Sequence, residues 1–173
     1  MPTFGDTTIE AGTFTGQVDQ KRAYRSVLTE DGVVSSVSIY MTGGTSAQVY
    51  KAVIYGDTAG APGALLWTSA EQTCGVSQAA GWVVISVSPG LSLTAGTYYL
   101  GFIAGTVTGW MTLQWVAGAG TNQYWSTDTY SDGATDPFGT PTGSDSTNIS
   151  IYATYAASAV PLSRVAMAPY LPN

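Results

Sequence analysis

Apolar side chains recur at every second position in several short segments of this sequence. In the segment 82–88, for example, Val83, Ile85 and Val87 alternate with Trp82 and serines. This period of two is typical of a β-strand, because successive side chains of a strand point to opposite faces. The segments in between do not show the period of 3.6 residues of an amphipathic helix. Strands are predicted over 33–41, 47–55, 82–88, 97–104, 110–116 and 149–154, with weaker predictions near 5–9, 22–28, 64–69 and 122–127.

The same alternation predicts which faces of these strands are buried. In 33–41 the core-facing set contains Val33, and Val34 lies on the opposite face. Lys51 marks the solvent-exposed face of 47–55, since a charged side chain is costly to bury. The segment 97–104 is apolar on both faces and is therefore predicted to be a central strand. The other members of the first core-facing set are Val37, Ile39 and Met41.

Turn-forming residues separate the predicted strands. Dipeptides that contain Gly or Pro commonly end a strand or helix. Charged residues make up only 9% of the chain, against about 25% in an ordinary globular protein. Short strands divided by such turns predict an all-β fold, a two-sheet antiparallel β-sandwich of jelly-roll type over residues 1–155. The turn dipeptides are Gly43-Gly44, Pro62-Gly63, Pro89-Gly90, Ala95-Gly96 and Asp132-Gly133.

Composition and charge argue against several functions. The chain has no His and a single Cys, Cys74, so a His-based general base or zinc site and an internal disulfide are all ruled out. Five Lys and Arg against eleven Asp and Glu give a net charge of −6, which disfavours a nucleic-acid partner. The start of the sequence does not resemble a signal peptide, and no apolar run is long enough for membrane insertion. No enzyme is predicted; a carboxylate pair involving Glu30 and Glu71 is the remaining catalytic alternative.

The segment 156–173 breaks the strand pattern. It contains Pro161, Pro169 and Pro172, which disfavour both a helix and a central strand. We therefore expect an extended C-terminal arm, either docked on its own domain or packed on a neighbouring subunit. The apolar residues that would make these assembly contacts are Val160, Leu162, Val165, Met167, Tyr170 and Leu171.

Exposed aromatic side chains are candidates for carbohydrate binding, because sugar rings stack on aromatic faces. Trp82, Trp110, Trp125 and Tyr130 are the candidates, from their outward positions in strands or from a loop position. Outward aromatics of a sandwich also pack under loops or into a subunit interface, and both alternatives stay open. Trp115, by contrast, is assigned to the core.

A loop with three carboxylates is a candidate for calcium. Asp128, Asp132 and Asp136 recur every fourth residue around a glycine, and Ca²⁺ takes six to eight oxygen ligands. The spacing differs from that of an EF-hand loop, and Asp-Gly is also a common turn. No other cofactor is expected.

Several strings of the sequence resemble a known family. They are 55–66 (YGDTAGAPGALL), 81–82 (GW), 93–102 (LTAGTYYLGF), 131–139 (SDGATDPFG) and 149–155 (ISIYATY). They resemble β-sandwich accessory domains of bacteriophage tail and virion proteins and of bacterial surface proteins, over residues 20–155. The resemblance implies a jelly-roll-like module without catalysis that serves in structure or adhesion.

These observations together predict a non-enzymatic structural protein of a bacteriophage virion. Capsid decoration and a tail or fibre subunit are the two forms considered, with assembly through the arm and the loop surfaces. The expected partners are other virion proteins and further copies of the chain, and the expected location is the virion. The alternative is a carbohydrate-binding module that contacts surface glycans through the exposed aromatics.

Overall fold

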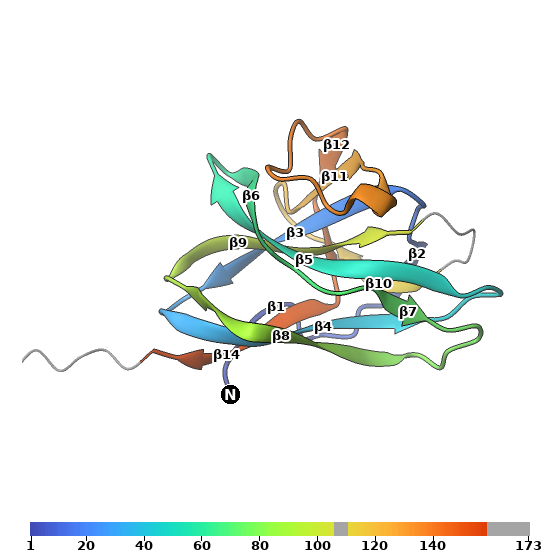
Figure 1. Ribbon diagram of the computed structural model, residues 1–173, viewed down its shortest axis with the longest axis horizontal. Helices are drawn as coiled ribbons and strands as arrows, with labels where there is room; N and C mark the ends of the chain where they lie inside the picture. The colour runs from blue at the N-terminus through green and yellow to red at the C-terminus, as the bar shows by residue number, and fades with distance from the viewer. Residues whose placement is uncertain (106–110, 159–173) are drawn as a thin grey trace, which may run out of the picture.

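The computed structural model describes residues 1–105 and 111–158 as two antiparallel sheets packed face to face (Figure 1). We name each sheet after its central strand. The β4 sheet consists of β1 (Thr3–Gly5), β2 (Gly12–Thr15), β4 (Gly32–Thr42), β8 (Gly81–Leu93), β10 (Thr112–Ala117), β13 (Thr147–Ile149) and β14 (Ile151–Ala157). The β9 sheet consists of β3 (Gln20–Leu28), β5 (Gln48–Thr58), β6 (Ala61–Thr68), β7 (Gln72–Cys74), β9 (Gly96–Ala104), β11 (Gln123–Thr127) and β12 (Gly143–Asp145).

The strand order is that of a jelly roll. One sheet contains the order β1-β14-β4-β8, the other contains β3-β9-β5-β6, and consecutive strands of this set mostly alternate between the sheets. The predicted all-β jelly-roll sandwich is therefore confirmed. The segment from β10 to β13 is inserted between β9 and β14, and it adds strands to both sheets. No helix within 1–105 and 111–158 is long and apolar enough to cross a membrane.

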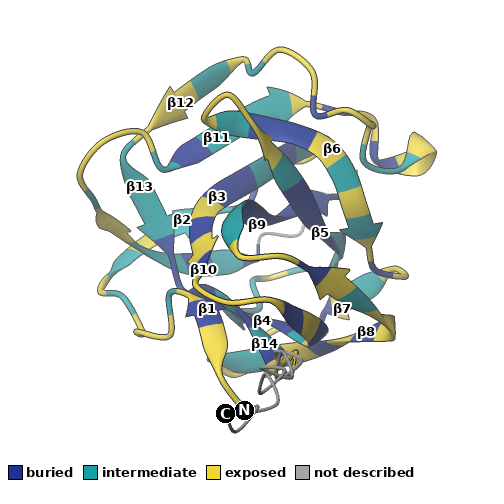
Figure 2. Cartoon of the chain, turned by 90° about the vertical axis from the view of Figure 1, so that its left-hand side faces the viewer, coloured by how far each residue is buried: buried dark blue, intermediate teal, exposed yellow. Residues whose placement is uncertain are grey.

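The main core lies between the two sheets, where the inward faces of the strands meet. Tyr24, Tyr50, Leu100 and Phe102 from the β9 sheet pack there against residues such as Ile39 of the β4 sheet. Strand β9 is buried along most of its length (Figure 2), as the apolar run on both of its faces predicted. The burial of such large side chains supplies the main stabilisation of the fold.

A second, smaller apolar cluster lies on the outer face of the β9 sheet. Val53 and Tyr55 project from β5 on the same face as Lys51, and both are fully buried. The ring of Phe138 packs edge-on against Tyr55 at 5.1 Å between ring centres. The prediction that this face is exposed to solvent is wrong here, because the segment between β11 and β12 folds over it.

Irregular strand geometry accounts for the other differences from the predicted pattern. A β-bulge between Val34 and Ser36 shifts the alternation of β4, so that Val34 is buried and Val33 is exposed. Pro89-Gly90 lies within β8 opposite this bulge and does not end the strand. Likewise, the hairpin between β5 and β6 turns at Ala59-Gly60, and Pro62-Gly63 belongs to β6. The first strand lies at Thr3–Gly5, ahead of the predicted 5–9.

The end of the described chain lies close to the predicted domain boundary. Strand β14 pairs with β4 as far as Ala157, two residues past the predicted boundary at 155. The predicted assembly residues of the C-terminal arm, 160–171, lie outside the described residues.

Candidate functional site: a cleft between the sheet edges

A cleft of about 430 Å³ opens between the two sheets on the side where the inserted strands lie. One wall comes from the β4 sheet, namely from β2, β10 and β13, and the other comes from β3, β11 and β12 of the β9 sheet. The first wall presents Thr13, Phe14, Thr15, Trp115 and Thr147, and the second presents Arg22, Gln123 and Asp145. We call this site the Arg22 cleft.

Arg22 is held in place by hydrogen bonds and by two aromatic rings. Its Nε donates to Oε1 of Gln20 at 2.7 Å, and one terminal nitrogen donates to Oε1 of Gln123 at 2.6 Å. Its Cζ lies 4.9 Å from the ring centre of Phe14 and 5.5 Å from that of Trp125. Such cation–π contacts and bonds fix the planar guanidinium in one orientation at the cleft wall.

A chain of hydrogen bonds connects Arg22 to Asp145. Oε1 of Gln123 also accepts from the hydroxyl of Tyr24 at 2.8 Å, and Nε2 of Gln123 donates to Oδ1 of Asp145 at 2.7 Å. The backbone N–H of Thr147 donates to the same oxygen at 2.8 Å. Because the buried Gln123 uses both of its polar atoms, it sets the positions of the cation and the carboxylate relative to each other.

The carboxyl group of Asp145 is ionised at neutral pH. Its partial removal from water acts to raise its pKa, but the hydrogen bonds from Thr147 and Gln123 and the charge of Arg22 outweigh this effect. The net result is a pKa below the ordinary value of a carboxyl. The cleft therefore presents one fixed positive and one fixed negative group, flanked by aromatic rings and threonine hydroxyls.

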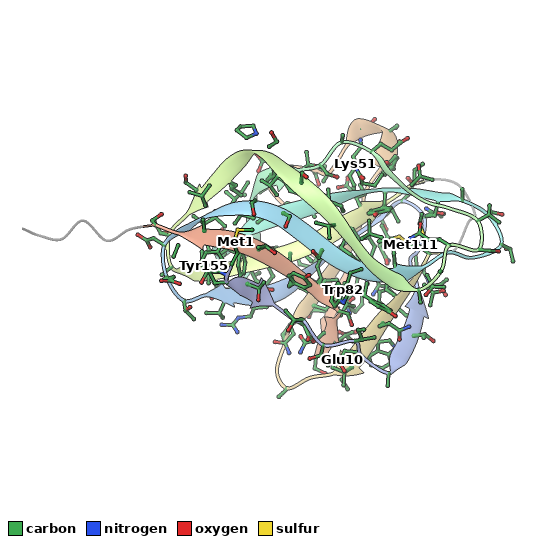
Figure 3. The ribbon with its side chains drawn as sticks, turned by 90° about the horizontal axis from the view of Figure 1, so that it is seen from below. Met1, Glu10, Lys51, Trp82, Met111 and Tyr155 are labelled. Carbon is green, nitrogen blue, oxygen red and sulfur yellow. The ribbon has the colours of Figure 1, made fainter. Side chains whose placement is uncertain are left out.

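The structure separates the aromatic residues that the sequence analysis grouped as glycan-binding candidates. Trp125 lies beside the cleft and contacts Arg22, whereas Trp82 lies on the outer face of the β4 sheet (Figure 3). Tyr130 is only 6% exposed, and its hydroxyl donates to Oε2 of Glu71 at 3.0 Å. The expectation of an exposed ring is therefore wrong for Tyr130, because Nζ of Lys51 lies over the ring, 4.7 Å from its centre. Trp110 lies outside the described residues.

Sequence reasoning missed the cleft residues Arg22, Gln123 and Asp145, and it assigned Trp115 wholly to the core. Trp115 does pack against the core, but it is only partly buried and its remaining surface lines the cleft. One available signal was Arg22 itself, which shares the inward face of β3 with the buried Tyr24. A charged side chain on an inward face indicates a site or a buried partner.

The three candidate calcium ligands each have a partner within the protein. Asp128 forms an ion pair with Lys21, Asp136 accepts from the N–H of Leu65 at 2.9 Å, and Asp132 accepts from the adjacent Ser131. In the described part of the chain, no group of three or more acidic or Cys side chains is placed to hold a metal ion. Calcium binding stays a prediction that the geometry does not support.

No protein-family model, no curated protein and no solved structure matches this chain. The functional interpretation therefore depends on the structure and on the patterns of the sequence.

Proposed function

We propose that this protein is a non-enzymatic structural subunit of a bacteriophage virion and that it binds a neutral carbohydrate in the Arg22 cleft. The observation that carries the binding proposal is the fixed pair of Arg22 and Asp145 on one wall of the cleft, with Phe14 and Trp115 on the other wall. The virion proposal is supported by the jelly-roll fold, by the family resemblance of the sequence strings and by an aromatic surface on the β4 sheet.

Neighbouring hydroxyl groups of a sugar ring match this pair of charged groups. A guanidinium donates hydrogen bonds to hydroxyl oxygens, and a carboxylate accepts them from hydroxyl hydrogens. The apolar face of the sugar ring fits against an aromatic side chain such as Trp115 or Phe14. Because the two charges compensate each other, and because the chain carries a net charge of −6, a neutral sugar is favoured over an anionic one.

The site needs little rearrangement to bind such a ligand. Arg22 and Gln123 are already restrained by hydrogen bonds and ring contacts, so little side-chain entropy is lost on binding. A single shallow sugar site binds weakly, but many copies on one particle would bind several glycans at once, and this multivalency would raise the overall avidity. This combination suits a repeated subunit on a virion surface that contacts the glycans of a host cell.

The outer face of the β4 sheet supplies a surface for assembly. Trp82 packs edge-on between Tyr40 and Tyr152, with ring centres 5.5 and 4.8 Å away. Val84, two residues further along β8, is 63% exposed. We call these four residues the β8 ridge. Aromatic and aliphatic surface of this kind is typical of the centre of a protein interface, so we assign it to contacts with another copy or another virion protein.

Replacing Arg22 with alanine is expected to weaken carbohydrate binding. The loss of charge-assisted hydrogen bonds should weaken affinity roughly tenfold or more, and circular dichroism should show an unchanged β spectrum. A screen of the purified protein on a glycan array, followed by isothermal titration calorimetry with the best neutral sugar, measures this effect. Trp82→Ala serves as the matched control and should bind as the wild type does. Equal binding by Arg22→Ala, or no binding of any neutral glycan, would overturn the carbohydrate proposal.

Introducing a charge into the β8 ridge is expected to reduce assembly. Val84→Asp places a carboxylate in the proposed interface, whereas Val76→Asp makes the same change at another exposed valine, outside the ridge. Sedimentation at increasing protein concentration and co-purification with phage particles measure the two variants. We expect loss of association for Val84→Asp only. A wild-type protein that stays monomeric and is absent from particles would contradict the virion proposal, independently of the sugar result.

A further inference from the structure

Lys21 and Asp128 form a buried ion pair on the outer face of the β9 sheet. Lys21 lies in β3 and is only 1% exposed, and Asp128 follows β11 and is 8% exposed. Nζ of Lys21 lies 3.0 Å from Oδ2 of Asp128. Lysine is rarely buried to this degree, and the Arg22 cleft on the opposite face of β3 does not use this pair.

Apolar and aromatic groups shield the Lys21 amine and the Asp128 carboxylate from water. The ring centre of Phe138 lies 4.6 Å from Nζ of Lys21, and Phe138 belongs to the buried cluster with Tyr55 and Ala23. An ion pair placed in such surroundings loses its hydration, which lowers the cost of converting the pair to a neutral amine and a neutral carboxylic acid. These neutral forms are the ones that can condense.

Thr135 connects the two side chains. Its hydroxyl donates to Oδ2 of Asp128 at 3.0 Å, and its backbone N–H donates to the same oxygen at 2.9 Å. Nζ of Lys21 in turn donates to the Thr135 hydroxyl oxygen. The hydroxyl therefore lies on a continuous proton path from the amine to one carboxylate oxygen.

We propose that Lys21 and Asp128 join spontaneously in an intramolecular isopeptide bond. One ammonium proton passes through the Thr135 hydroxyl to Oδ2, which leaves a neutral amine and a neutral carboxyl group. The lone pair of Nζ then attacks Cγ of Asp128 and forms the N–C bond. A second proton follows the same path to Oδ2, the Cγ–Oδ2 bond breaks, and one water molecule leaves. Oδ1 remains as the amide oxygen, and no oxidant or further reactant is needed.

The fixed geometry is what makes this condensation feasible. The amine and the carboxyl group are held in contact by neighbouring antiparallel strands, since Lys21 pairs with Ser126 in the register of β3 and β11. Holding two reacting groups together in this way raises their effective concentration by many orders of magnitude. The product ties the segment that covers the outer face of the β9 sheet to the sheet itself, which would suit a subunit exposed outside a cell.

The intact mass of the purified, denatured protein tests the proposal directly. We expect a mass lower than that of the sequence by one water molecule, apart from any removal of Met1, and a proteolytic digest should contain a branched peptide that joins Lys21 to Asp128. Lys21→Arg keeps the positive charge but cannot form the bond, so it should have the full mass. Lys51→Arg is the matched control and should still lack one water. Thr135→Val, without the hydroxyl relay, should form the bond more slowly.

Two results would overturn the proposal. A wild-type protein of full mass would show that Lys21 and Asp128 form an ion pair only. A missing water that persists in Lys21→Arg would place the dehydration elsewhere, for example at Asp132-Gly133, a sequence prone to cyclisation of its aspartate. Complete and rapid bond formation in Thr135→Val would overturn the relay. None of these results depends on carbohydrate binding or on assembly into a virion.

Discussion

Raising the pH above about 10 is expected to unfold this protein over a narrow range, because its buried tyrosines must ionise in the unfolded chain but not in the folded one. Burial is the main cause that raises the pKa of each of these phenols above its ordinary value. Neighbouring carboxylates act in the same direction for every one of them except Tyr50, although for Tyr24 the charge of Arg22 acts against this effect. The tyrosines are Tyr24, Tyr50, Tyr55, Tyr99 and Tyr130.

The hydrogen bonds of these phenols show why they stay neutral in the folded state. The hydroxyl of Tyr99 donates to Oδ1 of Asp57 at 3.1 Å, and that of Tyr55 donates to the carbonyl oxygen of Thr135 at 3.1 Å. A phenolate cannot donate, and its negative charge would face an acceptor oxygen. The stability that these groups contribute is therefore fully present below pH about 10, the pKa of an unperturbed tyrosine, and it decreases as the pH rises above that value.

The free energy of unfolding is expected to fall steeply as the pH rises. Each phenol that ionises only on unfolding reduces the free energy of unfolding by about 1.4 kcal/mol per pH unit, so five of them give about 7 kcal/mol per pH unit. A total stability of about 5–15 kcal/mol would be lost within one to two pH units. Circular dichroism and tyrosinate absorbance should therefore change together, in one cooperative step. Gradual ionisation near pH 10 with an intact β spectrum would contradict this prediction.

Tyr50→Phe provides a specific control. The hydroxyl of Tyr50 is buried and has no hydrogen-bond partner within the described residues, so removing it should not cost a hydrogen bond. We expect this variant to be at least as stable as the wild type at neutral pH. Above pH about 10, its slope should be lower by about 1.4 kcal/mol per pH unit.

Much of the sandwich could be predicted from the sequence because alternation is a local property. The inward sets in β8, β10 and β14, and the central position of β9, follow from neighbouring residues alone. The bulge between Val34 and Ser36 could not be predicted in this way. Relative to β14, β4 has one extra residue there, and this reverses the faces of the residues before it. The burial of Val53 likewise depends on Phe138, which lies far away in the sequence.

The Arg22 cleft was beyond local reasoning for the same reason. Its charged pair combines Arg22 of β3 with Asp145 of β12, and Gln123, which bridges them, comes from β11. Only the pairing of β11 with both β3 and β12 brings the three together. The sequence around Trp125 indicates that an aromatic ring is exposed there, and this ring contacts Arg22, but it carries no information on the polar groups beside it.

The insertion between β9 and β14 accounts for both proposed sites. It supplies Gln123 and Asp145 to the cleft, and it supplies Asp128, Thr135 and Phe138 to the buried pair on the opposite face of the β9 sheet. The eight-strand jelly roll thus acts as the scaffold. Lys21 and Arg22 are neighbours in β3 and project from opposite faces of this strand, each toward one of the two sites. A change at this point of β3 should therefore affect stability and binding together.

Gly101→Ala is expected to be among the most destabilising single substitutions in the chain. Gly101 in β9 pairs with Ala23 in β3, and a Cβ atom at Gly101 would overlap the backbone carbonyl oxygen of Arg22 and lie 2.9 Å from Cα of Ala23. Backbone atoms in the middle of a buried sheet cannot move aside without breaking ladder hydrogen bonds, so we expect a loss of about 3 kcal/mol or more.

Urea denaturation followed by tryptophan fluorescence measures this loss as a lower midpoint, with a slope that is unchanged if the folded state remains the same. Gly81→Ala is the matched control, because Gly81 also lies in a strand but no atom lies within 4 Å of the position that an alanine methyl group would take there. This control should stay within about 0.5 kcal/mol of the wild type. Because the overlap is with the backbone of Arg22 itself, any Gly101→Ala protein that does fold should also bind the cleft ligand more weakly. Equal stability of the two variants would mean that β3 and β9 do not approach each other closely at Arg22, and the cleft geometry would then have to be revised.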